Sequence, residues 1–178
     1  MSATTPPTET RNVIDYYWYW KTEAIKADLD TKRHPFAVLC VNVANDYNIS
    51  GVVRNANAFL AEKVYLYGRK KWDRRGAVGT QNYTHFEHIP ETDDLSALKE
   101  KYTLVGVDNV GDAEELDDFE WPERALMVFG QEQHGLSPDM LDMCDKKVYI
   151  KQYGSVRSLN VACASGIIMQ DFCRKLSR

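Results

Sequence analysis

Three polar stretches that contain glycine each follow an apolar run of the sequence, and their residue types suit the holding of a ligand. They are Asn45–Arg54, Gly130–Gly135 and Gln152–Asn160. Amide and guanidinium side chains form directional hydrogen bonds, and glycine lets backbone N–H groups come close to a bound molecule. The chemistry on offer is the binding of a polar molecule and the orientation of a reacting group.

In the first stretch, Asn48 stands where a helix is expected to begin, and Arg54 follows six residues later. Six helical residues turn through about 600°, so the two side chains do not share a face. Either Asn48 lies at a helix tip that faces a ligand and Arg54 reaches back along the helix, or Asn48 is an N-cap and Arg54 a surface residue. Composition alone favours the second interpretation.

The second stretch leads to Ser137, a predicted N-cap, through two glycines. It either brings backbone N–H groups to a ligand or forms an ordinary strand-to-helix turn. The third stretch enters a helix predicted from Ser158 to Leu176. Asn160, expected inside this helix, is a poor helix former, which indicates a role in a site. The helix also contains small residues that permit close approach of another backbone: Ala162, Ala164, Ser165 and Gly166.

Several common catalytic and metal-binding patterns are absent from the sequence. It contains no GxxxxGK[ST], GxGxxG or GxSxG motif, and its four cysteines form no CxxC pair. His85 and His88 form an HxxH pattern, but in a strand-like stretch they would point to opposite faces. We therefore expect no metal site.

The elements that must position the polar stretches alternate between strands and helices. Strands are predicted at Phe36–Val43, Lys63–Tyr67, Thr103–Val107, Ala125–Phe129 and Lys147–Ile150. Helices are predicted at Asp15–Leu29, Ile49–Leu60, Asp93–Lys101, Pro138–Met143 and Ser158–Leu176. This alternation predicts an α/β fold, a mainly parallel sheet flanked by helices, with ligands at the carboxyl ends of the strands.

Composition places the chain among ordinary globular domains. It has 178 residues, of which 44% are hydrophobic and 27% charged. The longest apolar runs, such as Ala37–Val41, are far too short to span a bilayer, and Met1–Arg11 does not look like a signal peptide. We expect a cytoplasmic protein with free thiols and no membrane partner.

The net charge of −4 hides an uneven distribution. Asp112–Glu123 holds seven acidic residues, which leaves 22 basic against 19 acidic residues elsewhere. Arg69–Arg75 places five cations around Trp72. This run is either a solvated loop, which charge alone favours, or a loop that contacts RNA. Its candidate RNA-binding residues are Arg69, Lys70, Lys71, Arg74 and Arg75.

Taken together and in this order, the motifs resemble those of the SpoU/TrmH family of SPOUT RNA methyltransferases. The matching patterns are N-x-x-G-x-x-R at Asn48–Arg54, F-G-x-E-x-x-G-L-S at Phe129–Ser137, and S-L-N-V-x-x-A at Ser158–Ala164. The resemblance covers about Pro35 to Leu176. It implies a SPOUT-type fold with a C-terminal deep trefoil knot, S-adenosylmethionine (SAM) as methyl donor, and a homodimer.

The resemblance also assigns roles to individual residues. It implies that Arg54 is the catalytic arginine, and a guanidinium suits orientation and charge stabilisation better than proton abstraction. The other polar site residues it implies are Asn48, Glu132, Ser158 and Asn160. The cofactor-binding residues it implies are Leu126, Gly130, Gly135, Ile150 and Leu159.

The implied reaction is methyl transfer to a ribose 2′-hydroxyl of RNA, with tRNA favoured over rRNA because the layout is compact. Residues 1–34 are expected to form a tail and a helical extension, and residues 35–178 the methyltransferase domain. The aromatic segment Tyr16–Trp20 either packs on the protein or stacks on RNA bases. Open alternatives are an rRNA substrate, a non-catalytic protein that binds SAM or RNA, and methylation of a small molecule or a protein.

Overall fold

A computed structural model describes residues 12–43, 46–68, 70–91, 95–131 and 134–176 of the chain. Seven strands form one sheet in the order β3-β2-β1-β6-β4-β7-β5, and every neighbouring pair is parallel. The strands are β1 (Phe36–Val41), β2 (Val64–Tyr67), β3 (Phe86–Ile89), β4 (Thr103–Val107), β5 (Glu114–Glu115), β6 (Ala125–Phe129) and β7 (Lys146–Tyr149). The predicted α/β fold with a mainly parallel sheet is confirmed.

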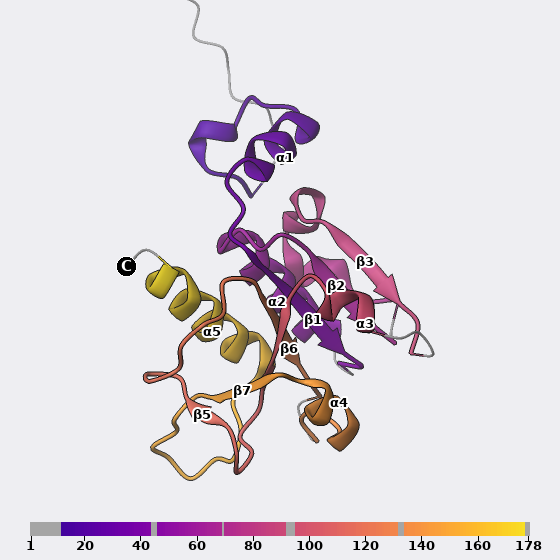
Figure 1. The fold of residues 1–178 in the computed structure, drawn as a ribbon. Coiled ribbons are helices and arrows are strands. Elements are labelled where there is room, and N and C mark those ends of the chain that lie inside the picture. The colour runs from indigo at the N-terminus through magenta and orange to yellow at the C-terminus, as the bar shows by residue number, and fades with distance from the viewer. Residues whose placement is uncertain (1–11, 44–45, 69, 92–94, 132–133, 177–178) are drawn as a thin grey trace, which may run out of the picture.

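Five α-helices and three short 3₁₀ helices accompany the sheet in the described part of the chain (Figure 1). The α-helices are α1 (Thr22–Asp30), α2 (Asp46–Ala58), α3 (Ser96–Lys99), α4 (Pro138–Met143) and α5 (Val161–Leu176). The 3₁₀ helices are η1 (Asp15–Tyr17), η2 (Arg74–Ala77) and η3 (Thr80–Tyr83). Within the residues described, no helix is both long enough and apolar enough to cross a membrane.

Alternate residues of the central strands build two separate cores, because successive side chains of a strand point to opposite faces. Phe36, Val38 and Cys40 of β1 pack with residues of α2 and α5 on one face. Ala37 and Leu39 pack on the other face, with residues of α4 and those around α3. Burial on both sides explains why the central strands are continuous apolar runs.

The predicted helix Asp15–Leu29 is wrong, since this stretch forms η1 and α1 as separate elements. The backbone of Lys21 is extended and interrupts the helical pattern. The rings of Tyr16, Tyr17 and Trp20 pack on one another there instead of lining one helix face. Aromatic residues are modest helix formers, so this packing prevails over the periodic pattern.

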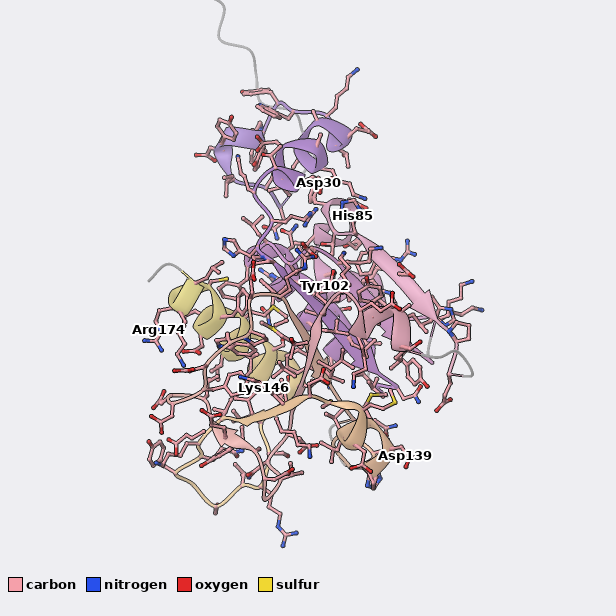
Figure 2. All side chains as sticks on the ribbon, in the orientation of Figure 1. Asp30, His85, Tyr102, Asp139, Lys146 and Arg174 are labelled. Carbon is pink, nitrogen blue, oxygen red and sulfur yellow. The ribbon has the colours of Figure 1, made fainter. Side chains whose placement is uncertain are left out.

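The N-terminal unit, which consists of η1, α1 and the residues around them, is held to the rest of the molecule by polar contacts next to α1. The Arg33 guanidinium donates to the carbonyl oxygens of Ala61 and Tyr83. His85 and Asp30 lie side by side between the unit and the sheet, with Nε2 2.8 Å from Oδ1 (Figure 2). Within the aromatic segment, Tyr17 is buried in a small cluster with Ile25 and Tyr83, and Trp20 packs against this cluster. Tyr16 and Tyr19 are exposed, so stacking on RNA bases stays an open alternative for these two rings.

Two strands, β3 and β5, are not among the strands predicted by residue range. β3 begins directly after His85 and contains His88, in the stretch described above as strand-like. The two histidines make separate contacts: His85 reaches Asp30, and His88 Nε2 lies 3.0 Å from the Gly68 carbonyl oxygen. β5 is a two-residue strand inside the acidic run. Among the residues described, no cluster of three potential metal ligands exists.

Candidate functional site

A cavity of about 270 Å³ lies at the carboxyl ends of β4, β6 and β7. Its wall is formed by residues that follow these three neighbouring strands, as expected for a parallel sheet. Of the residues predicted to bind a cofactor or to act in catalysis, Gly130, Gly135, Ile150, Ser158 and Leu159 line it. The second and third polar stretches of the sequence thus meet in one site.

The loop after β6 is closed tightly by backbone contacts. The N–H of Gln131 donates to the carbonyl oxygen of Gly135 at 3.1 Å, and the N–H of Gly135 donates back at 2.8 Å. A Cβ on Gly130 would lie 2.3 Å from the same Gly135 oxygen, so only glycine fits. Gly135 itself has φ +64°, in the left-handed region that favours glycine. Both glycines are therefore required by the shape of the cavity wall.

Asp108 fixes the far end of this loop and was not predicted as a site residue. Its Oδ2 accepts a hydrogen bond from the N–H of Leu136 at 2.8 Å, and Oδ1 accepts one from the N–H of Asn109. Asp108 and Asn109 both line the cavity. The sequence could have indicated both residues, because they directly follow the apolar strand β4 and ligands of parallel sheets bind at the carboxyl ends of the strands.

The third stretch ends in a helix cap rather than in a helix that starts at Ser158. α5 begins at Val161, and the Asn160 Oδ1 accepts hydrogen bonds from the N–H groups of Ala162 and Cys163. The prediction that Asn160 lies inside the helix is therefore wrong. Asparagine is a preferred N-cap, so this residue stabilises the helix start instead of weakening it.

Asn160 also connects the cavity to α2. Its Nδ2 donates to Oδ1 of Asn48 at 2.8 Å, which joins the first and third motifs directly. Asn48 is 7% exposed and lies in the first turn of α2, because the helix begins at Asp46. The prediction that Asn48 is the N-cap is corrected, whereas its place near the ligand end of the helix agrees with the sequence interpretation.

Helices α2 and α5 approach each other closely beside the cavity. A Cβ on Gly51 would lie 2.5 Å from the Cβ of Ala162, so the contact needs glycine on α2 and a small residue on α5. Nδ2 of Asn55 donates to the Ala162 carbonyl oxygen at 2.7 Å and lies 2.9 Å from Oγ of Ser165. The small residues of the third motif therefore serve close helix packing, as predicted.

The remaining predicted residues lie outside the cavity wall. Arg54 is exposed on α2, next to the packed Asn55, and does not line the cavity. Leu126 is fully buried in the core within β6, so its side chain is not accessible to a ligand. Glu132 and Arg69 lie outside the described residues.

The basic loop lies against the start of α2. Ser50 on α2 donates to the carbonyl oxygen of Asp73, and a Cβ on Gly76 would lie 2.7 Å from the Cβ of Ser50. The Arg75 guanidinium bonds the Asp73 carboxylate, and its Nη2 lies 3.5 Å from the hydroxyl of Tyr47. The structure thus places the cationic loop on the helix that carries Asn48 and Arg54.

Charged and polar side chains are mixed around the cavity. Asp108, His134 and Arg157 line it together with apolar residues such as Val107 and Leu159. Gln152 also lines it, and its buried Oε1 has no hydrogen-bond partner among the residues described. The arrangement can hold a ligand that has apolar and charged parts.

Comparisons with known proteins agree with this architecture. The chain is 26% identical over 161 residues to the tRNA (guanosine(18)-2′-O)-methyltransferase of Aquifex aeolicus, a match that spans 87% of this chain and 76% of that protein. It is 30% identical over 176 residues to the mouse tRNA (guanosine(18)-2′-O)-methyltransferase TARBP1, but this match spans only 11% of the mouse protein.

Solved structures show the same fold. The crystal structure of the A. aeolicus TrmH/SpoU tRNA modifying enzyme aligns with a TM-score of 0.77 at 25% identity, over 88% of this chain and 82% of that one. The SpoU methyltransferase AviRb from Streptomyces viridochromogenes, solved in complex with the cofactor AdoMet, aligns with a TM-score of 0.71 at 26% identity, over 82% of this chain and 59% of that one.

The family described as SpoU rRNA Methylase matches residues 35–170, which is well over half of the chain. The match contains all three motifs, the residues that line the cavity, helix α2 and α5 as far as residue 170. The resemblance inferred from the sequence is therefore confirmed, and this chain belongs to the SpoU methylase family.

Proposed function

We propose that this protein transfers a methyl group from SAM to a ribose 2′-hydroxyl of tRNA. The observation that carries the proposal is the joining of the three motifs in space: the second and third line one cavity, and the Asn48–Asn160 hydrogen bond connects the third to the helix of the first. The names of the Aquifex and mouse relatives support tRNA as the substrate and the ribose hydroxyl as the methylated group.

The cavity suits SAM as its ligand. SAM, when bound, supplies a methyl group on a positively charged sulfur, so the leaving group is part of the donor. The cavity offers the carboxylate of Asp108 for the positive part of such a molecule and the guanidinium of Arg157 for its carboxylate. Gly130 and Gly135 keep the backbone close to the ligand space. The residues present therefore fit the cofactor.

Positioning of the ribose falls to the residues at the start of α5. Ser158 lines the cavity, and Asn160 is held by its bond to Asn48 and by its cap of the helix. The fixed carboxamide of Asn160 keeps the start of α5 in place, and the Ser158 hydroxyl is positioned there to orient a hydroxyl toward the methyl donor. The guanidinium of Arg54 is suited to hold the RNA and to stabilise charge on the attacking oxygen, and not to abstract a proton.

The active form is proposed to be a homodimer. Arg54 is exposed and does not line the cavity of its own chain, while Ile167 (42% exposed) leaves apolar surface on α5. A second copy packed there would cover this surface and could bring its Arg54 to the site. Light scattering should then report about twice 20.4 kDa, and a monomer at working concentration would contradict the dimer.

Two further expectations from the sequence stay predictions: the trefoil knot in the C-terminal part and the cytoplasmic location. The fold shared with the TrmH/SpoU crystal structure supports the first. The knot is tested by measuring whether the C-terminal part becomes resistant to proteolysis on refolding. The location is tested by the cellular distribution of a tagged chain.

The reaction is tested by incubating the protein with methyl-labelled SAM and with unmodified tRNA or rRNA, then identifying labelled nucleosides by mass spectrometry. A labelled 2′-O-methylnucleoside from tRNA supports the proposal. The same product from rRNA alone would move the substrate to rRNA, and no label in either RNA despite SAM binding would favour a binding-only protein.

The role of Arg54 has its own test in the same assay. Arg54→Ala should lower methyl transfer roughly 100-fold or more, as expected for loss of a group that stabilises developing charge. Its affinity for SAM should stay within about twofold of the wild type, because Arg54 does not line the cavity. Arg54→Lys, which keeps the charge but not the planar fork, serves as the control with an intermediate rate. Equal loss of methyl transfer and SAM binding would overturn this role.

A further inference from the structure

The loop after β7 has a part that lines the cavity and a part that faces water. Gln152 and Arg157 line the cavity, whereas the four residues between them do not and are exposed. Tyr153, the first of these four, is 87% exposed, more than any other large hydrophobic side chain in the described part of the chain. A single exposed ring is common on protein surfaces, but the support and the charge around this one set it apart.

The ring of Tyr153 is supported by side chains of the sheet. Nζ of Lys151 lies 5.8 Å from the centre of the ring, a cation–π distance. The same ammonium is 3.1 Å from a carboxylate oxygen of Glu115, which also accepts a hydrogen bond from the Tyr149 hydroxyl at 3.2 Å. Glu115 and Tyr149 are partners in the register of β5 and β7. The sheet therefore anchors the cation beside the ring, and the high exposure of Tyr153 leaves ring surface open.

The charge of this loop suits a nucleic acid. Residues 150–160 contain two basic residues, Lys151 and Arg157, and no acidic residue. Tyr153 lies between the two cations in the sequence, and Arg157 lines the cavity. Open aromatic rings beside cations bind unpaired bases of RNA, because every base has a π face and is joined to negatively charged phosphates.

From these observations we infer that Tyr153 stacks on the base of the nucleotide whose ribose is methylated. The inference rests on the proposed function, since it takes RNA as the substrate and the cavity as the SAM site. The base is bonded to the ribose carbon next to the one that bears the 2′-hydroxyl, so a ribose held at Ser158 brings its base to this loop. Tyr153 is then a positioning residue: stacking fixes the plane of the base, and with it the direction of the hydroxyl, whichever base is present.

Removal of the ring should affect RNA and not SAM. Tyr153→Ala should raise KM for the RNA about 5- to 100-fold, the loss expected for one stacked base. Its dissociation constant for SAM should stay within about twofold of the wild type, because Tyr153 does not line the cavity. Tyr153→Phe keeps the ring and should restore the wild-type KM. Val156→Ala, at another exposed residue of the same loop, is the control and should change neither constant. An unchanged KM in Tyr153→Ala would overturn the inference.

An RNA that lacks the target base identifies what the ring contacts. The labelled nucleotide of the wild-type reaction defines the position, and a synthetic RNA that is abasic there keeps its 2′-hydroxyl. Loss of the base should lower kcat/KM of the wild type at least as much as Tyr153→Ala does on the normal RNA. The variant should then react with the abasic RNA as well as the wild type does, because both changes remove the same contact. If the two losses multiply, Tyr153 does not stack on that base and the inference is wrong.

Light scattering separates base stacking from a contact between two copies of the chain. Tyr153→Ala should have the same mass in solution as the wild type. A smaller mass that accompanies the weaker RNA binding would make the ring a subunit contact and overturn the inference alone. If the wild-type protein binds no SAM or labels no RNA, the proposed function fails and the inference fails with it, which is a distinguishable outcome.

Discussion

The two ends of the parallel strands use their charged residues in opposite ways. At the amino ends, Glu62 accepts two hydrogen bonds from Arg124 at 2.7 and 2.8 Å and one from the Tyr102 hydroxyl at 2.6 Å. At the carboxyl ends, Asp108, His134 and Arg157 line a cavity together with apolar residues. Polar groups at the amino ends of the strands stabilise the fold, whereas those at the carboxyl ends line a cavity that can hold a ligand.

Helix α5 shows the same contrast along a single element. It begins at the cavity, where Asn160 caps it and holds Asn48. It ends near the amino ends of the strands, where buried Asp171 accepts hydrogen bonds from Trp121 and Arg174 and forms an ion pair with Lys175. Substitutions at the two ends should therefore separate function from stability.

The largest expected effect lies at the carboxyl end. Gly130→Ala would place a methyl group against the backbone of Gly135 and displace the loop that forms the cavity wall. We expect kcat/KM for SAM to fall roughly 100-fold, as for a displacement of about 1 Å in a site. Gly154→Ala is the control, because a Cβ there meets nothing within 4 Å. Wild-type SAM affinity in Gly130→Ala would contradict the assignment of this loop.

At the other end of α5, Asp171→Asn should destabilise the protein by about 3 kcal/mol at neutral pH, because it breaks a buried charge network. Burial alone would raise the pKa of Asp171, but bonds from Arg174, Trp121 and Lys175 outweigh it and lower the pKa. The unfolding free energy, measured in urea, should be lower than that of the wild type while kcat per folded molecule is unchanged.

The pH dependence follows from the direction of that shift. A carboxyl whose pKa is lowered on folding stabilises the folded state above its unfolded pKa, and this contribution disappears as pH falls through the folded pKa. Wild-type stability should thus decline below about pH 4, and Asp171→Asn should flatten the decline. An equally steep decline in the variant would contradict this assignment.

A smaller loss is expected for Glu62→Ala. It removes the acceptor shared by Tyr102 and Arg124 and should cost about 2 kcal/mol in urea unfolding, the effect of leaving the buried Tyr102 hydroxyl without this acceptor. Glu87→Ala is the matched control, since Glu87 forms an exposed ion pair with Lys63 and should cost about 0.5 kcal/mol or less. SAM affinity should be unchanged in both variants. If Glu62→Ala weakened SAM binding and left stability unchanged, the assignment of the amino ends to stability would be wrong.

Regular elements could be predicted from the sequence where local pattern and burial agree. β6 was predicted at its observed bounds, because a strand covered on both faces is a continuous apolar run. β5 could not be predicted, since it consists of Glu114 and Glu115 and pairs with β7 only through tertiary context. The extent of the aromatic helix was wrong because ring packing, not periodicity, decides the path of residues 15–21.

The candidate site was predictable in its motifs but not in its contacts. Gly130 and Gly135 could be predicted because the local backbone of the loop leaves no room for a side chain, and this requirement is visible in the sequence as glycine. The Asn48–Asn160 bond joins residues 112 positions apart, so only the fold reveals it. Asp108 was not predicted as a site residue, because its hydrogen bond to the N–H of Leu136, 28 positions away, is set by the fold.

The smallest expected effect concerns the basic loop. It tests whether a cationic side chain without an ion pair, such as Arg74, contacts RNA. Arg75 is bonded to Asp73, so its charge is largely balanced, whereas exposed Arg74 forms no ion pair with any of the described residues. If the loop binds RNA phosphates, Arg74→Ala should lower the slope of log affinity against log salt by about 1, and Arg75→Ala should lower it less. Equal slopes for wild type and Arg74→Ala would make the loop a solvated surface and confine the RNA contacts to the cavity and α2.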